Sequence, residues 1–188
     1  MSNIILGSKS PRRQELLSLI TLEFDTYVIE VDEKVDEVEP IKIVEAISKK
    51  KMEAYTKKFK TEKIIITADT IVSCDNKVLG KPKDYNEAIE MIKLLSGKVH
   101  EVLTCVTINY YGKIVSFTEI TKVSVINMTD NQINSYLMLN ESYDKAGAYG
   151  IQGYFRLYID RIDGDYYNVM GLPVCRLNQE LIKLRDEN

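Results

Sequence analysis

The sequence predicts an α/β fold built on a mixed β-sheet. Strand-like and helix-like segments alternate in the first half of the chain, and two long alternating segments, 99–109 and 113–125, then form a hairpin around Tyr111-Gly112. Alternation of strands and helices is typical of parallel pairing, whereas a tight hairpin requires an antiparallel pair. At 188 residues, and without a linker or repeat, the chain is expected to form a single domain over residues 1–188.

The first half of the chain alternates between short apolar runs and amphipathic stretches. An apolar run predicts a buried strand, proline predicts the first turn of a helix, and glycine predicts its end, as at Gly97. The expected elements are, in order, a strand over 3–7, a helix from Pro11, a strand over 24–31, a helix from Pro40, a strand over 63–67, a turn at 74–77 and a helix that starts after Asp84, which has capping-box spacing to Glu87.

The second half begins with the long hairpin. Thr129 and Gln132 have the spacing of a helix start, and the small residues of 144–153 predict a loop that allows close backbone approach. The elements expected after the hairpin are, in order, a helix from Thr129 to about Leu139, the loop 144–153, a strand over 154–162 and a helix that Pro173 opens, with Val174, Leu177, Leu181 and Leu184 inward.

Composition excludes several classes of protein. Twenty-five basic and twenty-eight acidic side chains give a formal charge of −3, which disfavours a nucleic-acid-binding module. No apolar run is long enough to span a membrane, and the first residues have no leader signature, so we expect a cytoplasmic protein. The three scattered cysteines, Cys74, Cys105 and Cys175, are expected to be reduced and mostly buried.

The segment Ser8 to Leu17 is the first candidate site. Ser8, Ser10, Arg12 and Arg13 bring hydroxyls and guanidinium groups to the start of a helix, where backbone N–H groups and the helix dipole favour a phosphate. It is not a Walker A loop, because no glycine stands at the required upstream spacing. A capped helix with solvated arginines accounts for these residues equally well.

Carboxylates and lysines supply further candidates. Asp69 is expected at the exit of a strand, where it could ligate Mg²⁺ or accept a proton from water, although a turn or N-cap aspartate is the commoner role. Lys81, in the turn Gly80-Lys81-Pro82, could reach a phosphate or simply be a surface residue. Glu33 and Lys51 are of types that are more often solvated than catalytic.

Two further features concern ligands. His100 is the only histidine, so it cannot anchor a zinc site and is expected to be a polar residue at the start of a strand. In the loop 144–153, the side-chain amide of Gln152 offers a paired donor and acceptor that can read the edge of a base.

Taken together and in this order, these segments resemble the Maf family of nucleoside triphosphate pyrophosphatases. The chain departs from the dTTP/UTP branch of that family at Glu141-Ser142, where the branch usually has Glu-Pro. The matching stretches, spread along nearly the whole chain, are 8–17, 68–72, 80–82, 95–104, 144–153 and 164–173.

The resemblance implies an elongated α/β domain with flanking helices and two lobes around a cleft, related in shape to the inosine triphosphate pyrophosphatases. It implies hydrolysis of a nucleoside triphosphate between the α- and β-phosphates, to monophosphate and pyrophosphate, with Mg²⁺, Mn²⁺ or Co²⁺ as cofactor. The implied catalytic residue is Asp69. The implied substrate-binding residues are Ser8, Arg12, Arg13, Glu33, Lys51 and Lys81, and Asp69 and Glu33 are the implied metal ligands.

Arg12, Thr70 and Gln152 match three selective positions of the branch that prefers dTTP and UTP. The resemblance therefore implies these substrates, with modified pyrimidine nucleotides left open, and it permits a homodimer. The alternative is a non-catalytic nucleotide-binding regulator, for instance of cell division, which would bind phosphate but gain nothing from Asp69.

Overall fold

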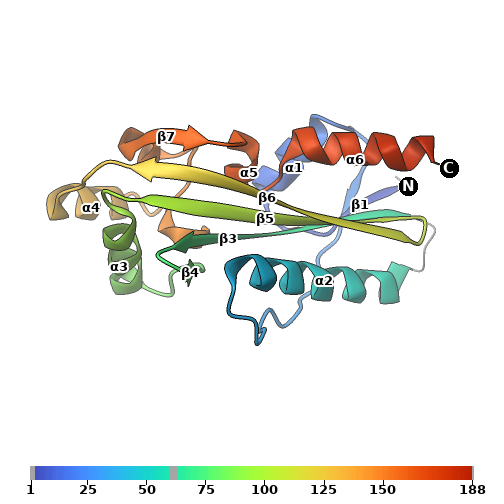
Figure 1. The fold of residues 1–188 in the computed structure, drawn as a ribbon, viewed down its shortest axis with the longest axis horizontal. Helices are drawn as coiled ribbons and strands as arrows, with labels where there is room; N and C mark the ends of the chain where they lie inside the picture. Colours follow the sequence, from blue (N-terminus) through green and yellow to red (C-terminus); the bar gives the residue numbers. More distant parts are fainter. Residues whose placement is uncertain (1–2, 60–62, 188) are drawn as a thin grey trace.

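The computed structural model describes residues 3–59 and 63–187, and in it an open mixed sheet runs the length of the molecule (Figure 1). The strand order is β2-β1-β3-β5-β6-β7, with β4 paired to β3. Among the strands that the structure describes, only β1 pairs in parallel, with β2 and with β3. The strands are β1 (Ile4–Leu6), β2 (Asp25–Thr26), β3 (Ile64–Cys74), β4 (Lys77–Leu79), β5 (Val99–Tyr110), β6 (Lys113–Val125) and β7 (Ile159–Asp163).

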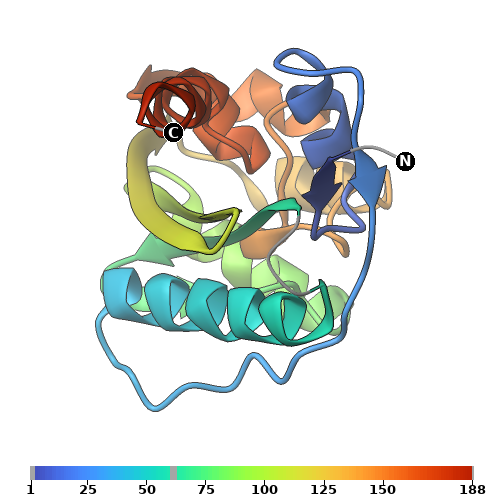
Figure 2. The ribbon, with the colours of Figure 1, turned by 90° about the vertical axis from the view of Figure 1, so that its right-hand side faces the viewer.

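Helices cover both faces of the sheet. In Figure 1 α1, α5 and α6 lie on one side of the strands and α2 lies on the other, while α3 and α4 gather at one end; Figure 2 shows α2 and α6 on opposite faces, viewed along the strands. The α-helices are α1 (Pro11–Ser18), α2 (Pro40–Phe59), α3 (Tyr85–Leu95), α4 (Asp130–Leu137), α5 (Tyr166–Met170) and α6 (Val174–Asp186).

The core is divided by the sheet because successive strand residues point to opposite faces. On β3, Ile66 and Ala68 belong to the apolar cluster shared with α1 and α6, whereas Ile65 packs with Met52 of α2. Ile71, also on the α2 face, packs with α2 further along the strand. A separate apolar cluster lies at the end of the molecule where α3 and α4 pack. The elongated α/β architecture that the sequence predicts is confirmed (Figure 1).

β3 is longer than the sequence predicts. The expected strand ended at residue 67, with Asp69 at its exit, but β3 runs from Ile64 to Cys74, which places Asp69 in the middle of the strand. The long β5 hairpin strand causes this difference, since it supplies partners as far as the Ser73–Glu101 pair.

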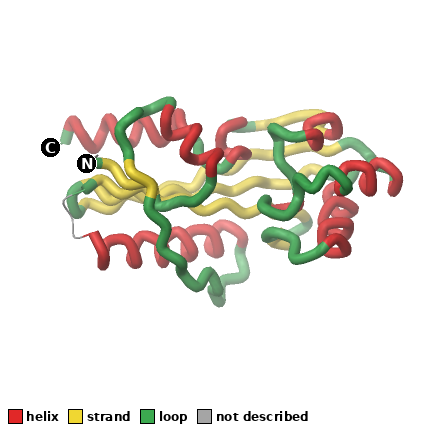
Figure 3. The backbone as a smooth tube through the Cα atoms, turned by 180° about the vertical axis from the view of Figure 1, so that it is seen from behind, coloured by secondary structure: helices red, strands yellow, loops and turns green. Residues whose placement is uncertain are grey.

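Two other predicted strands are present but much shorter than expected. The strand expected over 24–31 shrinks to Asp25–Thr26 because its partner β1 has only three residues, and the chain then runs as a loop to α2 (Figure 3). The strand expected over 154–162 begins as a 3₁₀ helix, η2 (Tyr154–Tyr158), because Phe155 turns inward against Tyr136 and Tyr149. Only its last part becomes β7.

The predicted helix starts and turns are confirmed. Thr129 and Gln132 form a capping box for α4, and Asp84 caps α3. Gly97 has a φ of +71° after α3, and Tyr111 and Gly112 have positive φ in the hairpin turn. Cys74 and Cys105 are buried, Cys175 is exposed, and all three are free thiols. Within the described ranges, no helix is long and apolar enough to cross a membrane.

Candidate active site

A cleft opens where β1 ends and β3 continues. β1 pairs with Ile64–Ile66 of β3, and β4 pairs only from Val72 onward. Between these two pairings the described strands leave this edge of β3 free. The chain leaves β1 through Gly7, where an added Cβ would lie 2.8 Å from both Thr67 and Tyr55. Glycine is therefore required at the point where the chain turns into the loop before α1.

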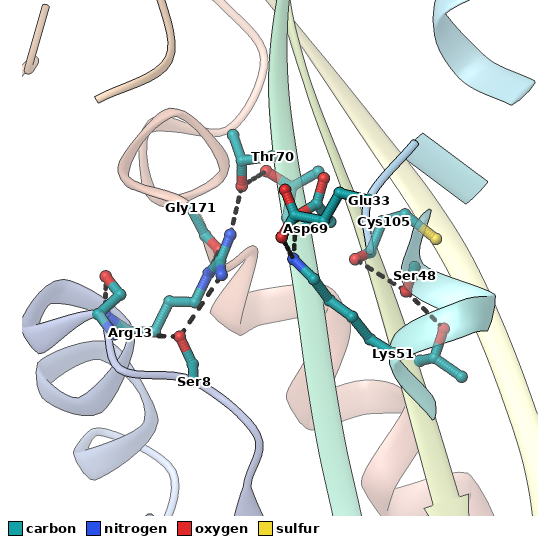
Figure 4. Close-up of polar contacts among 12 residues, drawn as sticks. Ser8, Arg13, Glu33, Ser48, Lys51, Asp69, Thr70, Cys105 and Gly171 are labelled. Atoms are coloured by element: carbon teal, nitrogen blue, oxygen red, sulfur yellow. Dashed lines mark hydrogen bonds and ion pairs between the residues drawn. The ribbon is translucent and has the colours of Figure 1, made fainter. Parts of the chain in front are cut away.

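Asp69 and Thr70 lie on this free edge and point to opposite faces of the sheet. Asp69 lies on the side of α2, whereas Thr70 lies on the side of α1 and α5 (Figure 4). Both residues nevertheless line the same cleft. No described strand pairs with this edge of β3 between Ile66 and Val72, so the cleft is open to both faces of the sheet. In open α/β sheets, ligands bind beyond the carboxyl ends of strands. We expected the site at the end of β3, but the cleft lies at the end of β1, beside the middle of β3.

Lys51 connects two carboxylates on the α2 side of the cleft. Its ammonium forms ion pairs with Asp69 and, at 2.8 Å, with Glu33 of the loop that precedes α2. The Lys51 and Asp69 side chains are 16% and 12% exposed, whereas Glu33 is 57% exposed. The attraction between two charges is stronger in such an enclosed site than in water, because the local dielectric is low. The ion pair therefore holds the Lys51 and Asp69 side chains in place.

Arg13 lies on the other side of β3, anchored by three acceptors. Its Nε donates to the carbonyl oxygen of Gly171 at 2.8 Å, Nη2 donates to Thr70 Oγ1 at 2.8 Å, and Nη1 donates to Ser8 Oγ at 3.5 Å. Burial lowers the pKa of Arg13, while the carboxylate of Asp69 acts in the opposite direction. The guanidinium remains cationic and has a fixed orientation.

α1 begins at the cleft as the sequence predicts. Ser10 caps it by accepting from the backbone N–H of Arg13, and Pro11 stands in the first turn. Arg12 points across the cleft and pairs with Asp144 at 3.1 Å. Partial burial raises the pKa of Asp144, but the hydrogen bonds and charges of Lys145 and Arg12 outweigh burial, so the pKa lies below its usual value.

The loop 144–153 forms the opposite wall of the cleft. It contains a short 3₁₀ turn, η1 (Ala146–Ala148), in which Gly147 has a φ of +69° and approaches Val72 closely enough that a Cβ would lie 3.1 Å away. Glu141 anchors the loop at both ends, because its carboxylate accepts from the N–H of Tyr154 at 2.9 Å and its carbonyl oxygen accepts from Lys145.

The remaining two predicted residues sit at the rim. Lys81 and Gln152 are both exposed and both line the cleft. The carbonyl oxygen of Gly80 accepts from Gly147 at 3.0 Å, which ties the turn that carries Lys81 to the loop that carries Gln152.

The cleft has a volume of about 940 Å³ and brings together every predicted site residue. Apolar side chains such as Val28 and Ile47 also line it. Among the described lining residues, six are cationic and four are anionic, which gives a locally basic site on an acidic protein. The predicted residues that line it are Ser8, Arg12, Arg13, Glu33, Lys51, Asp69, Thr70, Lys81 and Gln152.

Sequence reasoning missed several lining residues. Lys9 and Lys145 add cationic groups, and each stands inside a segment that was singled out for its other members. Tyr149 also lines the cleft, and its hydroxyl is 2.7 Å from Nε2 of His100. His100 is fully buried at the start of β5, and this burial lowers its pKa to about 4.

The two carboxylates on Lys51 could hold a divalent cation. No group of three or more His, Cys, Asp or Glu with metal-binding geometry occurs in the described parts of the chain, so a site made of protein ligands alone is absent there. Mg²⁺, however, is usually bound by one or two carboxylates together with substrate phosphates and water. Asp69 and Glu33, both in contact with Lys51, fit that donor set.

Fold and site together define an α/β protein with a basic cleft whose lining suits an anionic ligand. The family model described as Maf-like protein matches residues 3–184, and the chain belongs to the Maf family. Curated relatives named dTTP/UTP pyrophosphatase include one from Lachnoclostridium phytofermentans, 45% identical over 97% of this chain and 95% of the relative. Another, from Carboxydothermus hydrogenoformans, is 48% identical over 95% of this chain and 96% of the relative.

Proposed function

We propose that this protein hydrolyses dTTP and UTP to the nucleoside monophosphate and pyrophosphate. The observation that carries the proposal is the enclosed Lys51–Asp69 pair in a basic cleft that also contains the anchored Arg13. Relatives that are 44–48% identical over nearly the whole chain and bear the name dTTP/UTP pyrophosphatase support it.

The triphosphate would lie along the basic part of the cleft. A triphosphate carries about four negative charges, which an acidic protein can bind only where cations are concentrated. Arg13 offers a planar fork, and the hydroxyl of Ser8 stands beside it at the start of α1. Lys81 at the rim and Lys51 on the α2 side would bind the remaining phosphate oxygens.

Asp69 is the proposed catalytic residue. Its carboxylate would accept the proton of the water that cleaves the α–β phosphoanhydride, while Lys51 holds the carboxylate in place. Glu33 and Asp69 would hold a divalent cation, which would neutralise charge on the leaving pyrophosphate. Mg²⁺, Mn²⁺ and Co²⁺ are the candidate ions.

Uracil and thymine would be selected at the loop 144–153. Both bases present the pattern O2, N3–H and O4, and the side-chain amide of Gln152 can match two adjacent groups of this edge. Arg12 and Thr70 complete the proposed selective set. Because Arg12 is already paired with Asp144, it would act by fixing the loop beside the base as well as by direct contact.

Pyrophosphate release tests the proposal directly. The protein is incubated with UTP, dTTP, modified pyrimidine triphosphates, CTP and ATP, each with Mg²⁺, Mn²⁺ or Co²⁺, and the products are separated. We expect monophosphate and pyrophosphate from UTP and dTTP, and far less from CTP or ATP. Binding of UTP without any hydrolysis would instead favour a nucleotide-binding regulator, and release of orthophosphate would contradict the cleavage position.

A further inference from the structure

A chain of hydrogen bonds runs from the cleft into the sheet behind it. Nη2 of Arg13 is 2.8 Å from Thr70 Oγ1, which is 2.9 Å from Thr104 Oγ1. Thr104 Oγ1 is in turn 3.1 Å from the backbone oxygen of Asn168 in α5. Thr104 lies on β5 directly opposite Thr70, is fully buried and does not line the cleft. We call these four groups the hydroxyl chain.

The chemistry of its two ends fixes the direction of the hydroxyl chain. A guanidinium can only donate, a carbonyl oxygen can only accept, and each threonine hydroxyl has one proton. Thr104 therefore gives its proton to Asn168, and Thr70 gives its proton to Thr104. If Thr70 donated elsewhere, two oxygens without a proton between them would face each other at 2.9 Å. Thr70 is thus left as an acceptor toward Arg13.

The carbonyl end of the hydroxyl chain is itself held in place. Asn168 is fully buried, and its Nδ2 donates to the carbonyl oxygen of Val102 and to Thr121 Oγ1, each at 3.0 Å. The acceptor for Thr104 is therefore part of the sheet and α5 packing. Thr104 joins this rigid acceptor to a side chain of the cleft.

We propose that Thr104 is a positioning residue that acts through Thr70 on Arg13. This proposal rests on the proposed function, in which Arg13 binds the triphosphate. Three of the five N–H donors of Arg13 are engaged by Gly171, Thr70 and Ser8, and the other two have no acceptor among the described residues. Thr104 fixes Thr70, and Thr70 fixes the guanidinium of Arg13, so the two remaining N–H donors already point toward the substrate. Less conformational entropy of Arg13 is then lost when the triphosphate binds.

Thr107 provides a matched control on the same strand. It is nearly as buried as Thr104, at 3% exposure, and its Oγ1 is 2.7 Å from Ser48 Oγ and 3.0 Å from Ser116 Oγ. It points to the α2 face and has no hydrogen bond to Arg13 or Thr70 in the described structure. Thr107→Val therefore removes a buried hydroxyl from β5 without touching the hydroxyl chain.

The first experiment compares Thr104→Val, Thr104→Ser and Thr107→Val for UTP hydrolysis and thermal unfolding. Because Thr104→Val removes the acceptor that orients the Thr70 hydroxyl, on which the hydrogen bond from the charged Arg13 depends, we expect it to lower kcat/KM about 10- to 100-fold. Thr104→Ser keeps the hydroxyl and should stay within about threefold of wild type. Thr107→Val should lower the unfolding temperature like Thr104→Val and leave kcat/KM nearly unchanged. Equal losses in the two valine variants would overturn the proposal.

A double-mutant cycle with Arg13→Lys then asks whether Thr104 acts through Arg13. Because lysine cannot reproduce the fork, Thr104→Val should have little further effect in the Arg13→Lys background. Independent, multiplying losses would contradict the proposal. If Thr104→Val does not fold, Thr104→Cys, whose thiol donates and accepts only weakly, takes its place with the same expectation.

Binding separates this proposal from the proposed function. Affinity for α,β-imido-UTP, which cannot be cleaved at the α–β position, is measured for wild type and each variant. If the wild-type protein binds the analogue but does not hydrolyse UTP, the proposed function is refuted. The double-mutant cycle of Thr104 and Arg13, measured as affinity for the analogue, still decides the role of Thr104. A wild type that binds no analogue contradicts both proposals.

Discussion

Lys51 of α2 forms an ion pair with Asp69 in the middle of β3, and both side chains are less than a fifth exposed. This pair joins a helix to the free edge of a strand across the floor of the cleft. Removing the charge of Lys51 leaves the Asp69 carboxylate largely enclosed without its ion-pair partner, which costs more than losing a surface ion pair. The pair therefore connects the stability of the fold to the chemistry of the site.

Lys51→Met should reduce both stability and turnover. Without the ammonium, Asp69 and Glu33 keep their negative charges at one place with no cation between them. We expect a loss of about 1–3 kcal/mol in the free energy of unfolding and at least about a tenfold loss in kcat with UTP. Urea denaturation and steady-state kinetics measure the two effects. Lys49→Met, an exposed position on the same helix, should change neither.

Lys81→Ala should weaken substrate binding without affecting the fold. Lys81 is exposed at the rim of the cleft and forms no ion pair within the described chain. We expect KM for UTP to rise by about tenfold, with the larger difference from wild type at low salt, because exposed charges are screened. The unfolding temperature should not move. Lys83→Ala, two residues away and outside the cleft, serves as control, and an equal rise in KM there would refute a specific contact.

Gln152→Ala should relax the choice of base. A site that hydrogen-bonds a substrate edge rejects mismatched analogues strongly, and cytosine reverses two of the polarities that uracil presents. We expect the ratio of kcat/KM for UTP over CTP to fall by at least about tenfold, mainly through slower UTP hydrolysis. Gln179→Ala on α6 should leave the ratio unchanged. An unchanged ratio in Gln152→Ala would mean that backbone groups read the base.

His100 should make the protein less stable at mildly acidic pH. Burial lowers its pKa to about 4, so between pH of about 6.5 and 4 the unfolded chain binds a proton that the folded protein does not. The free energy of unfolding should therefore fall as the pH falls, by about 2–3 kcal/mol between pH 7 and pH 4.5.

His100→Gln provides the comparison for this pH effect. The variant retains a polar side chain beside Tyr149 but cannot titrate. Because the carboxylates are the same in both proteins, the difference between the two stability curves isolates His100, the only histidine. Parallel curves over this pH range would contradict the shifted pKa.

Local sequence signals predicted those parts of the fold that depend on neighbouring residues. The capping pair Thr129 and Gln132, the start at Pro11 and the turn at Gly112 all depend on contacts within a few residues, and the structure has each where it was expected. The predicted ends of β2 and β3 were wrong, because a strand extends only as far as the neighbouring strand that pairs with it. The lengths of β1 and β5 set those ends.

In the candidate site, too, residue types were predictable from the sequence, whereas contacts between distant residues were not. Residue type and order singled out Asp69, Arg13 and Gln152, which the structure places at one cleft. The sequence could not show that Arg12 pairs with Asp144, 132 residues further along the chain. Nor could it show that Thr104 stands behind Thr70, since that follows from the register of β3 against β5.

Turnover of UTP by Asp69→Asn tests the central claim most directly. Asparagine keeps the size of the side chain, and its amide oxygen can still accept from Lys51, but it cannot take the proton of the attacking water. We predict that kcat falls by about 10²–10⁴ while affinity for α,β-imido-UTP stays close to that of wild type. Turnover near the wild-type value in a folded Asp69→Asn protein would contradict the assignment of Asp69 and with it the account of the site.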